Sequence, residues 1–184
     1  MNRWAVFLRG VNVGGHGKLA MAELRDALPE MGAQNSATYI QSGNIVFSHD
    51  SHDANQVAQQ VERVIQQRFG FHPLALAYSA DALDRLISSL PTAEAAQGKV
   101  AGSNIYVYLT FNGPDIREIS PLLDYCTQGE SLHRLATGLA VIAPMGIGRS
   151  KLTAPLEKLL AGQATARNLN TLRRVQELLK GKSV

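Results

Sequence analysis

The stretch from Arg9 to Leu19, RGVNVGGHGKL, concentrates residue types that can receive an anion. Its four glycines permit positive φ, which lets neighbouring backbone N–H groups point toward one place. Arg9, Asn12 and Lys18 add side-chain donors beside this turn. An apolar strand precedes the turn and a helix is expected to follow it, so the sequence predicts an anion-binding turn with a helix N-terminus behind it.

Neither standard phosphate-binding glycine pattern fits this stretch. Counting back from Gly17 and Lys18 places Asn12 where a P-loop begins with glycine, and Leu19 where it carries Ser or Thr. Residues 15–20 match the dinucleotide glycine pattern, but the region about 20 residues further on holds no Asp or Glu for a ribose. Two interpretations remain, a non-standard anion site and a tight connection that needs glycine for its backbone alone.

A second polar group, Gln41, Ser42 and Asn44, lies between two β-rich runs. These residue types are common in hairpin turns. In a split β-α-β unit the first and third strands are antiparallel neighbours. The start of the third strand, near Asn44, should therefore lie beside the end of the first, near Arg9, and this polar group should lie next to the glycine-rich turn.

The segment TARNLNT, residues 165–171, is a third candidate. Asn168 or Asn170 is a natural N-cap for the last helix. Capping accounts for one of these amides, which leaves Arg167 and the other amide for a second anion-receiving corner. The sequence does not decide whether this corner and the glycine-rich turn form one site.

The sequence contains little evidence for a metal site or a bound cofactor. The segment 49–53, HDSHD, is interpreted as a polar loop before a helix, with Asp53 as the cap. Cys126 is the only cysteine, so the chain can form neither an internal disulfide nor a thiolate-rich metal site. We expect no metal and no cofactor. His16 is the only histidine within the glycine-rich stretch and is its natural acid or base.

The apolar periodicity predicts the elements that would position these residues. Strands are expected at 4–9, 38–40, 45–47 and 73–78, with helices over 21–32 and 57–69. This β-α-β-β-α-β order is that of a ferredoxin-like unit. The second half repeats the order, with strands at 105–111, 132–135, 139–143 and 164–167. Its helices are expected at 83–90, 116–123, from a Thr153 cap to 160, and 172–179.

The predicted fold class is therefore α+β, with two ferredoxin-like subdomains, antiparallel sheets and a C-terminal helix. The first subdomain is expected over 1–80, a helix and linker over 81–103, and the second subdomain with its helical extension over 104–184.

Composition narrows the class of protein. A hydrophobic content of 45% over 184 residues excludes a disordered chain. No apolar run approaches the roughly 18 to 20 residues that a membrane helix needs, and the N-terminus lacks a cleavage-site pattern. These features, with the single cysteine, predict a cytoplasmic protein with no membrane partner. From Arg149 onward, eight basic residues face only Glu157 and Glu177, which indicates an anionic partner or a solvated basic helix.

Four motifs in order resemble a known family: LRGVNVGG at 8–15, MAEL at 21–24, YIQSGNIVF at 39–47 and TARNLNT at 165–171. Together they closely resemble domain-of-unknown-function family 1697. The resemblance implies two ferredoxin-like subdomains and a helical C-terminal extension, and it implies no assigned activity. The family usually has an aromatic residue where this chain has Leu169, which argues against a stacking role there.

The leading hypothesis is a cytosolic protein of unknown cellular role that binds a phosphate-bearing or other anionic ligand. Its binding residues would be Arg9, Asn12, Gly14, Gly15, Lys18, Gln41, Ser42 and Asn44, with Arg167, Asn168 and Asn170 at the second corner. One alternative is nucleic-acid binding through the sheet surface and the basic C-terminal segment. Tyr106 and Tyr108 would then stack on bases, unless they pack beneath a helix. Another is an enzyme acting on a small phosphorylated substrate, with His16 as proton carrier. The sequence leaves the oligomeric state open.

Overall fold

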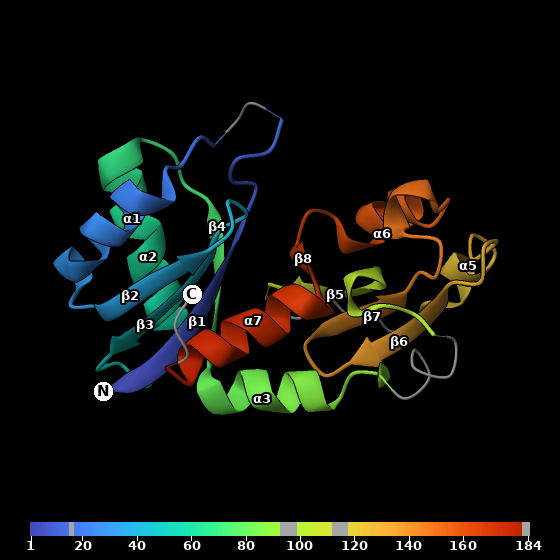
Figure 1. Cartoon of the computed structure of the whole chain (residues 1–184). Coiled ribbons are helices and arrows are strands. Elements are labelled where there is room, and N and C mark those ends of the chain that lie inside the picture. The colour runs from blue at the N-terminus through green and yellow to red at the C-terminus, as the bar shows by residue number, and fades with distance from the viewer. Residues whose placement is uncertain (15–16, 93–98, 112–117, 182–184) are drawn as a thin grey trace. The chain divides into compact units, whose positions relative to one another are not determined.

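The computed structural model describes residues 1–14, 17–92, 99–111 and 118–181 (Figure 1). Packing divides the chain into two compact units, the first comprising Met1–Arg85 with the segment from Arg174, the second Leu86–Arg173. Each unit contains a four-stranded sheet, and all the strand pairs in both sheets are antiparallel. The expected α+β fold of two ferredoxin-like parts with a C-terminal helix is confirmed.

The first unit follows the predicted element order. It contains β1 (Asn2–Arg9), α1 (Met21–Ala27), β2 (Gln34–Tyr39), β3 (Asn44–His49), α2 (Ala54–Phe69), β4 (Leu74–Ser79) and the start of α3 (Ala80–Ser88). The strand order is β2-β3-β1-β4, with β1 in the centre. On one face of β1, Trp4, Val6 and Leu8 are buried in a core cluster that also contains residues of α1 and α2.

Local residue choices explain where the helices of the first unit begin and end. The Asp53 carboxylate caps α2 by accepting hydrogen bonds from the amides of Asn55 and Gln56, as the sequence predicted. Gly70 ends this helix with φ 76°. The helix expected over 21–32 is shorter, because α1 ends at Ala27 and a 3-10 helix, Leu28–Met31, carries Pro29 and ends at Gly32. Proline has no amide hydrogen for an α-helical bond, which accounts for the change.

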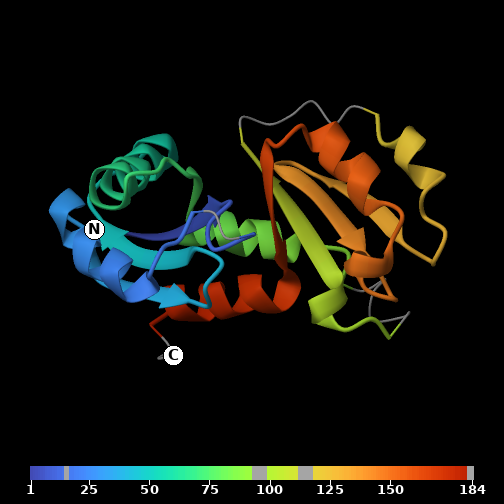
Figure 2. The same cartoon turned by 90° about the horizontal axis from the view of Figure 1, so that it is seen from above.

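The second unit repeats this arrangement. Its elements are β5 (Ile105–Thr110), α5 (Ser120–Leu123), β6 (Ser131–Leu135), β7 (Gly138–Ile142), α6 (Thr153–Leu160), β8 (Ala164–Asn168) and the start of α7 (Leu169–Leu179). The strand order is β6-β7-β5-β8, which is equivalent to that of the first unit. Figure 2 shows α6 running across this sheet, and Leu152, Leu156 and Leu160 share a core cluster with Leu139 and Val141 of β7. Residues 116 and 117 of the expected helix 116–123 lie outside the described residues.

The prediction that Thr153 caps α6 is wrong. Leu152 is the N-cap residue and makes no side-chain capping bond. The Thr153 hydroxyl instead donates to the Ile147 carbonyl oxygen at 3.0 Å. The Ser150 hydroxyl oxygen accepts from the Leu152 amide at 3.1 Å, so the residue that organises this helix start lies three positions earlier than expected.

The segment from Arg174 packs with the first unit, although the sequence-based boundaries placed all of 104–184 in the second. Three polar contacts account for this. The Gln176 amide donates to the Asp84 carboxylate at 2.6 Å, Lys180 pairs with Asp84 at 3.1 Å, and the Arg3 guanidinium donates to the Leu178 carbonyl oxygen at 2.9 Å. These long-range contacts have no local sequence signal.

Glu130 gives the stability of the second unit a predicted pH dependence. Burial alone would raise the pKa of this carboxyl, but hydrogen bonds from the Ser150 hydroxyl and the Gln128 amide together outweigh burial and hold the pKa below its ordinary value. A depressed carboxyl pKa contributes stability that is present above the unfolded pKa and is lost as the pH falls through the folded value. Glu130→Gln should therefore be less stable than the wild type at pH 7, and the gap should narrow below about pH 4.5. Urea unfolding across this range measures it, and a gap that stays constant with pH would contradict the assignment.

Candidate functional site

The end of β1 and the turn between β2 and β3 lie side by side. In the register of the two strands Phe7 is opposite Asn44, and the Leu8 amide donates to the Gly43 carbonyl oxygen at 2.8 Å. This is the adjacency expected from the split β-α-β topology. We call residues 9–19 the glycine loop and residues 40–44 the hairpin turn; together they form the candidate site.

Asn12 locks the two parts of the candidate site together. Its side-chain nitrogen donates to the Leu19 carbonyl oxygen at 2.9 Å and to the Gln41 carbonyl oxygen at 2.8 Å. Its side-chain oxygen accepts from the Leu19 amide at 2.9 Å, and its backbone amide donates to Gly17 at 3.0 Å. Both hydrogens of the Asn12 side-chain amide are therefore used within the protein. Asn12 therefore joins the two parts of the candidate site, and its role as a ligand contact stays a prediction.

Asn44 holds the hairpin turn in a similar way. Its side chain is buried, and its nitrogen donates to the Tyr39 carbonyl oxygen at 2.9 Å and to the Ser42 hydroxyl at 3.0 Å. The turn also places Ile40 at φ 49° with 52% of the residue exposed. A β-branched residue is strained in this region, so the bonds of Asn44 help to keep a costly conformation.

The cationic side chains of the site are accessible to solvent. Arg9 and Lys18 are both exposed, and neither the glycine loop nor the hairpin turn contains an acidic residue. The helix expected behind the loop, α1, begins only at Met21, has seven residues and has no side-chain cap. Gly15 and His16 lie outside the described residues. The positive character of the corner therefore comes from Arg9, Lys18 and the backbone rather than from a helix dipole.

The backbone of the glycine loop has an alternating conformation. φ is positive at Gly10, Asn12 and Gly14, at 72°, 55° and 60°, and is not positive at the two intervening valines. Such alternation is typical of backbone nests that bind anions. Among the described residues, no acceptor takes the amide hydrogens of Val13 and Gly14.

At the second corner, the side chains of Arg167 and Asn168 make hydrogen bonds within the protein. Arg167 is buried, and one guanidinium nitrogen donates to the Thr165 hydroxyl at 2.8 Å and to the Ala166 carbonyl oxygen at 2.7 Å. Burial lowers the pKa of Arg167 to about 10, so the group stays protonated at neutral pH. The Asn168 side-chain oxygen accepts from the Thr171 amide at 2.9 Å, which confirms Asn168 as a cap of α7. Asn170 is exposed.

The two tyrosines considered for base stacking pack within the second unit. Tyr108 is buried in the core cluster with Leu152 and Leu156, and Tyr106 packs against the same cluster. Burial, followed by the nearby Glu157 and Tyr106, raises the pKa of Tyr108 to about 12. Tyr108 is therefore buried against residues of α6 and Tyr106 is only partly exposed, which weakens the case for an aromatic pair that stacks on bases.

The His49–Asp53 segment is held by internal hydrogen bonds. The His49 Nε2 atom contacts the Met31 carbonyl oxygen at 2.9 Å, and Nδ1 accepts from the Ser51 amide at 3.0 Å. Both ring nitrogens are therefore engaged. Over residues 1–14, 17–92, 99–111 and 118–181, no group of three or more His, Cys, Asp or Glu side chains is arranged to hold a metal ion.

Sequence reasoning missed a cavity at the start of β1. Its wall includes Arg3 and Trp4 of β1, His52 of the HDSHD segment and Asp81 of α3, and no single motif brings these residues together. The only signal in the sequence is the presence of two polar residues, Asn2 and Arg3, at the beginning of an otherwise apolar strand.

The fold and the site define a class, an α+β protein of two ferredoxin-like units with a cationic, glycine-rich corner in the first. Residues 1–138 match the model of the family described as "Protein of unknown function (DUF1697)", and the chain belongs to this family. It is similar over nearly its whole length to a solved structure, the conserved bacterial protein SP0830 from Streptococcus pneumoniae. The identity is 25%, the TM-score is 0.76, and the match covers 98% of this chain and 99% of that one. No curated protein matches the sequence. In the part of the chain that the structure describes, every helix is too short or too polar to cross a membrane.

Proposed function

We propose that the candidate site binds an anionic ligand, with a phosphate group as its preferred chemistry. The observation that carries this proposal is the combination of two exposed cations, Arg9 and Lys18, with the backbone amides of Val13 and Gly14, which have no acceptor among the described residues. No acidic residue occurs in the glycine loop or the hairpin turn. Phosphate binds well where backbone amides and cations converge, because each oxygen accepts several charge-assisted hydrogen bonds.

The residues of the site divide into two roles. Arg9, Lys18, Gln41 and Ser42, with the amide of Gly14, would contact the ligand. Asn12 and Asn44 would keep the glycine loop and the hairpin turn in place, because their side-chain amides are already used within the protein. A locked loop favours binding, since less conformational entropy is lost when the ligand binds.

Inorganic phosphate and pyrophosphate test this function in a thermal-shift titration. At a ligand concentration about 100 times the dissociation constant, binding should stabilise the protein by about 2.7 kcal/mol. Lys18→Ala and Arg9→Ala should each weaken binding about fivefold or more, because each removes a charge-assisted contact. Raising the salt concentration should reduce the wild-type affinity.

Lys158→Ala is the matched control, because Lys158 is an exposed lysine on α6 in the second unit. It should bind both anions as the wild type does. The proposal fails if neither anion stabilises the wild type at about 10 mM, or if Lys18→Ala and Lys158→Ala bind equally well.

A further inference from the structure

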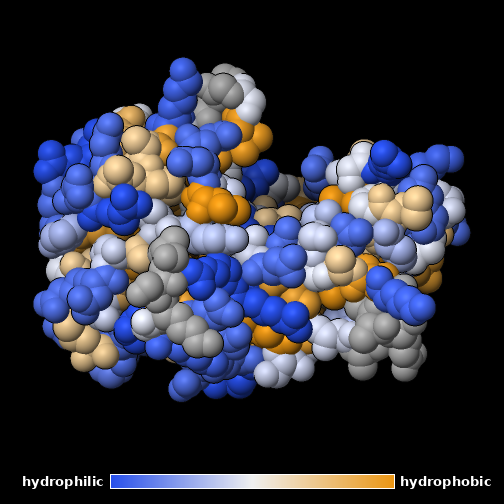
Figure 3. Space-filling model, in the orientation of Figure 1, coloured by the Kyte–Doolittle hydropathy of each residue, from blue (hydrophilic) through white to orange (hydrophobic). Residues whose placement is uncertain are grey.

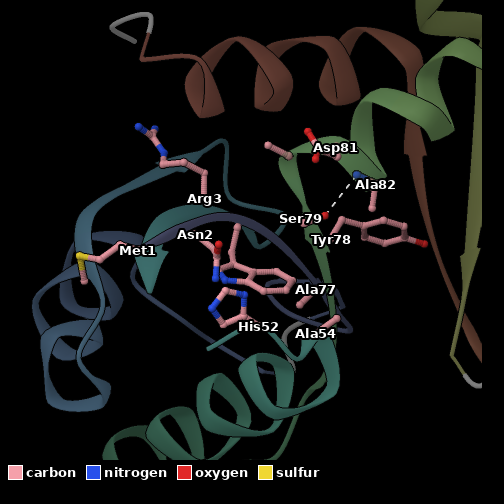
Figure 4. A pocket seen from close by; sticks show the side chains of 12 residues that line it. Met1, Asn2, Arg3, His52, Ala54, Ala77, Tyr78, Ser79, Asp81 and Ala82 are labelled. Atoms are coloured by element: carbon pink, nitrogen blue, oxygen red, sulfur yellow. Dashed lines mark hydrogen bonds between the residues drawn. The ribbon is translucent and has the colours of Figure 1, made fainter. Parts of the chain in front are cut away.

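A second cavity lies at the opposite end of β1 from the glycine loop. It has a volume of about 560 Å³ and is lined by residues of the first unit only, from the beginning of β1, from the loop before α2 and from the junction of β4 and α3 (Figure 4). Small-molecule sites in proteins usually have volumes of roughly 300 to 1,000 Å³. The cavity is therefore large enough for a metabolite of modest size.

Two side chains of opposite charge, Arg3 and Asp81, line this cavity without pairing. Arg3 donates from one guanidinium nitrogen to the Leu178 carbonyl oxygen at 2.9 Å. Within the described residues, Arg3 contacts no carboxylate and Asp81 contacts no cation. In Figure 4 the Arg3 guanidinium and the Asp81 carboxylate stand well apart, and both residues line the cavity. Asp81 is exposed. Because the two groups do not neutralise each other, the cavity presents both signs of charge to a ligand.

Two side-chain donors at the start of β1, one on each face of the strand, also lack acceptors among the described residues. Trp4 is 3% exposed, and its indole nitrogen is buried with no acceptor among the described residues. The Nε atom of Arg3 is also buried and has no acceptor among the described residues. Buried donors without acceptors are rare in folded proteins, and they are commonly satisfied by a bound water, ion or ligand.

The start of α3 adds a favourable field for a carboxylate. This helix has nine residues, and Ala80, Asp81 and Ala82 of its first turn line the cavity. The Ser79 hydroxyl accepts from the Ala82 amide at 3.2 Å, as the dashed line in Figure 4 marks. The N-terminal end of a helix carries partial positive charge, which attracts an anionic group.

We propose that this cavity binds a small zwitterion, a molecule with one carboxylate and one ammonium group, of which a free α-amino acid is the simplest example. The carboxylate binds on the side of Arg3 and the α3 start, and the ammonium group pairs with Asp81. A simple anion would be repelled by Asp81 and a simple cation by Arg3, so only a ligand with both charges satisfies both residues. Asp81 can stabilise the first turn of α3, and Arg3 donates a hydrogen bond to Leu178. These two roles account for each residue separately, but they do not explain why both line one cavity without forming an ion pair. The site is separate from the glycine loop, and the proposal does not depend on that loop binding an anion.

Blocked analogues test the charge requirement on the unmodified protein. The wild type is titrated by isothermal calorimetry with the twenty free L-amino acids, and the amino acids that bind are repeated as their N-acetyl and their carboxamide derivatives. We expect at least one free amino acid to bind, and each blocked form to bind about tenfold or more weakly, since each lacks one charge-assisted contact. Equal binding of the N-acetyl form overturns the proposal in favour of a simple anion site. Absence of binding by all twenty at about 10 mM overturns it as well.

Two variants assign the contacts to Arg3 and Asp81. Asp81→Asn and Arg3→Gln should each weaken binding of the free amino acid about tenfold. Asp81→Asn should also abolish the preference for the free form over its N-acetyl derivative, an outcome that a purely structural role of Asp81 would not produce. Asp124→Asn and Arg63→Gln make the same chemical changes at exposed positions outside the cavity and should bind as the wild type does. Equal binding by Asp81→Asn and Asp124→Asn contradicts the proposal.

Discussion

Replacing Gly138 by alanine should lower the free energy of unfolding by about 3 kcal/mol or more, because a backbone overlap cannot be relieved by a side-chain rotation. Gly138 begins β7 and lies opposite Leu109 of β5 in the central strand pair of the second sheet. A Cβ atom at this position would overlap the backbone carbonyl oxygen of Tyr108. Either the β5–β7 pairing or the path of β7 must change to accept it. Urea unfolding followed by circular dichroism measures the loss.

Gly148→Ala is the control for this substitution. Gly148 has no positive φ, and an added Cβ would meet no atom within 4 Å. Its stability should remain within about 0.5 kcal/mol of the wild type. A similar loss for both variants would mean that Gly138 matters for chain flexibility and not for the close approach of β5 and β7.

The order of the elements was predictable because its signals are local. Apolar residues at helical spacing marked α2, and Asp53 and Gly70 marked its ends by side-chain capping and by a left-handed cap. The apolar run of β1 indicated a buried strand, which is central in the sheet. The described part of the chain has eight strands, and the strands and helices follow an order that repeats once. Connections between strands in known folds are un-knotted and, where chirality applies, right-handed, so few topologies are compatible with this order.

The candidate site was predictable only in its location. The topology implied that the start of β3 lies beside the end of β1, and the register of Phe7 and Asn44 agrees. The role of Asn12 was not predictable, because its partners are the carbonyl oxygens of Leu19 and Gln41, and nothing in the sequence shows which carbonyl an amide will meet. The burial of Arg167 escaped sequence reasoning for a similar reason, since its charge indicated an exposed position.

The cavity at the start of β1 had almost no sequence signal beyond the two polar residues that begin this strand. Arg3 and Asp81 are 78 positions apart and belong to no motif. Their common cavity depends on the pairing of β1 with β4, in which Trp4 lies opposite Ser79, and on α3 beginning directly after that pair. Sites assembled by strand register in this way need coordinates, whereas sites built on one loop leave a pattern in the sequence.

Gly43→Ala should destabilise the first unit by about 3 kcal/mol, combining a backbone strain of about 1–2 kcal/mol with overpacking of similar size. Gly43 has φ 75°, and an added Cβ would lie 2.6 Å from the Leu8 Cβ and 2.8 Å from a methyl carbon of Val11. Its carbonyl oxygen accepts the Leu8 amide, so the same substitution should also disturb the contact between the hairpin turn and the glycine loop. Trp4 is the only tryptophan and is buried in the core of the first unit, so its fluorescence reports this unfolding directly.

The variant Gly70→Ala separates the cost of backbone strain from the cost of overpacking. Gly70 has φ 76°, nearly the same as Gly43, but an added Cβ would meet no atom within 4 Å. It should therefore lose only the strain of a left-handed alanine, about 1–2 kcal/mol. The excess loss in Gly43→Ala then measures how tightly the hairpin turn packs on the end of β1. If the two variants lose the same stability, the turn has room to move away from Leu8 and Val11, and the rigid corner on which the anion site depends does not exist.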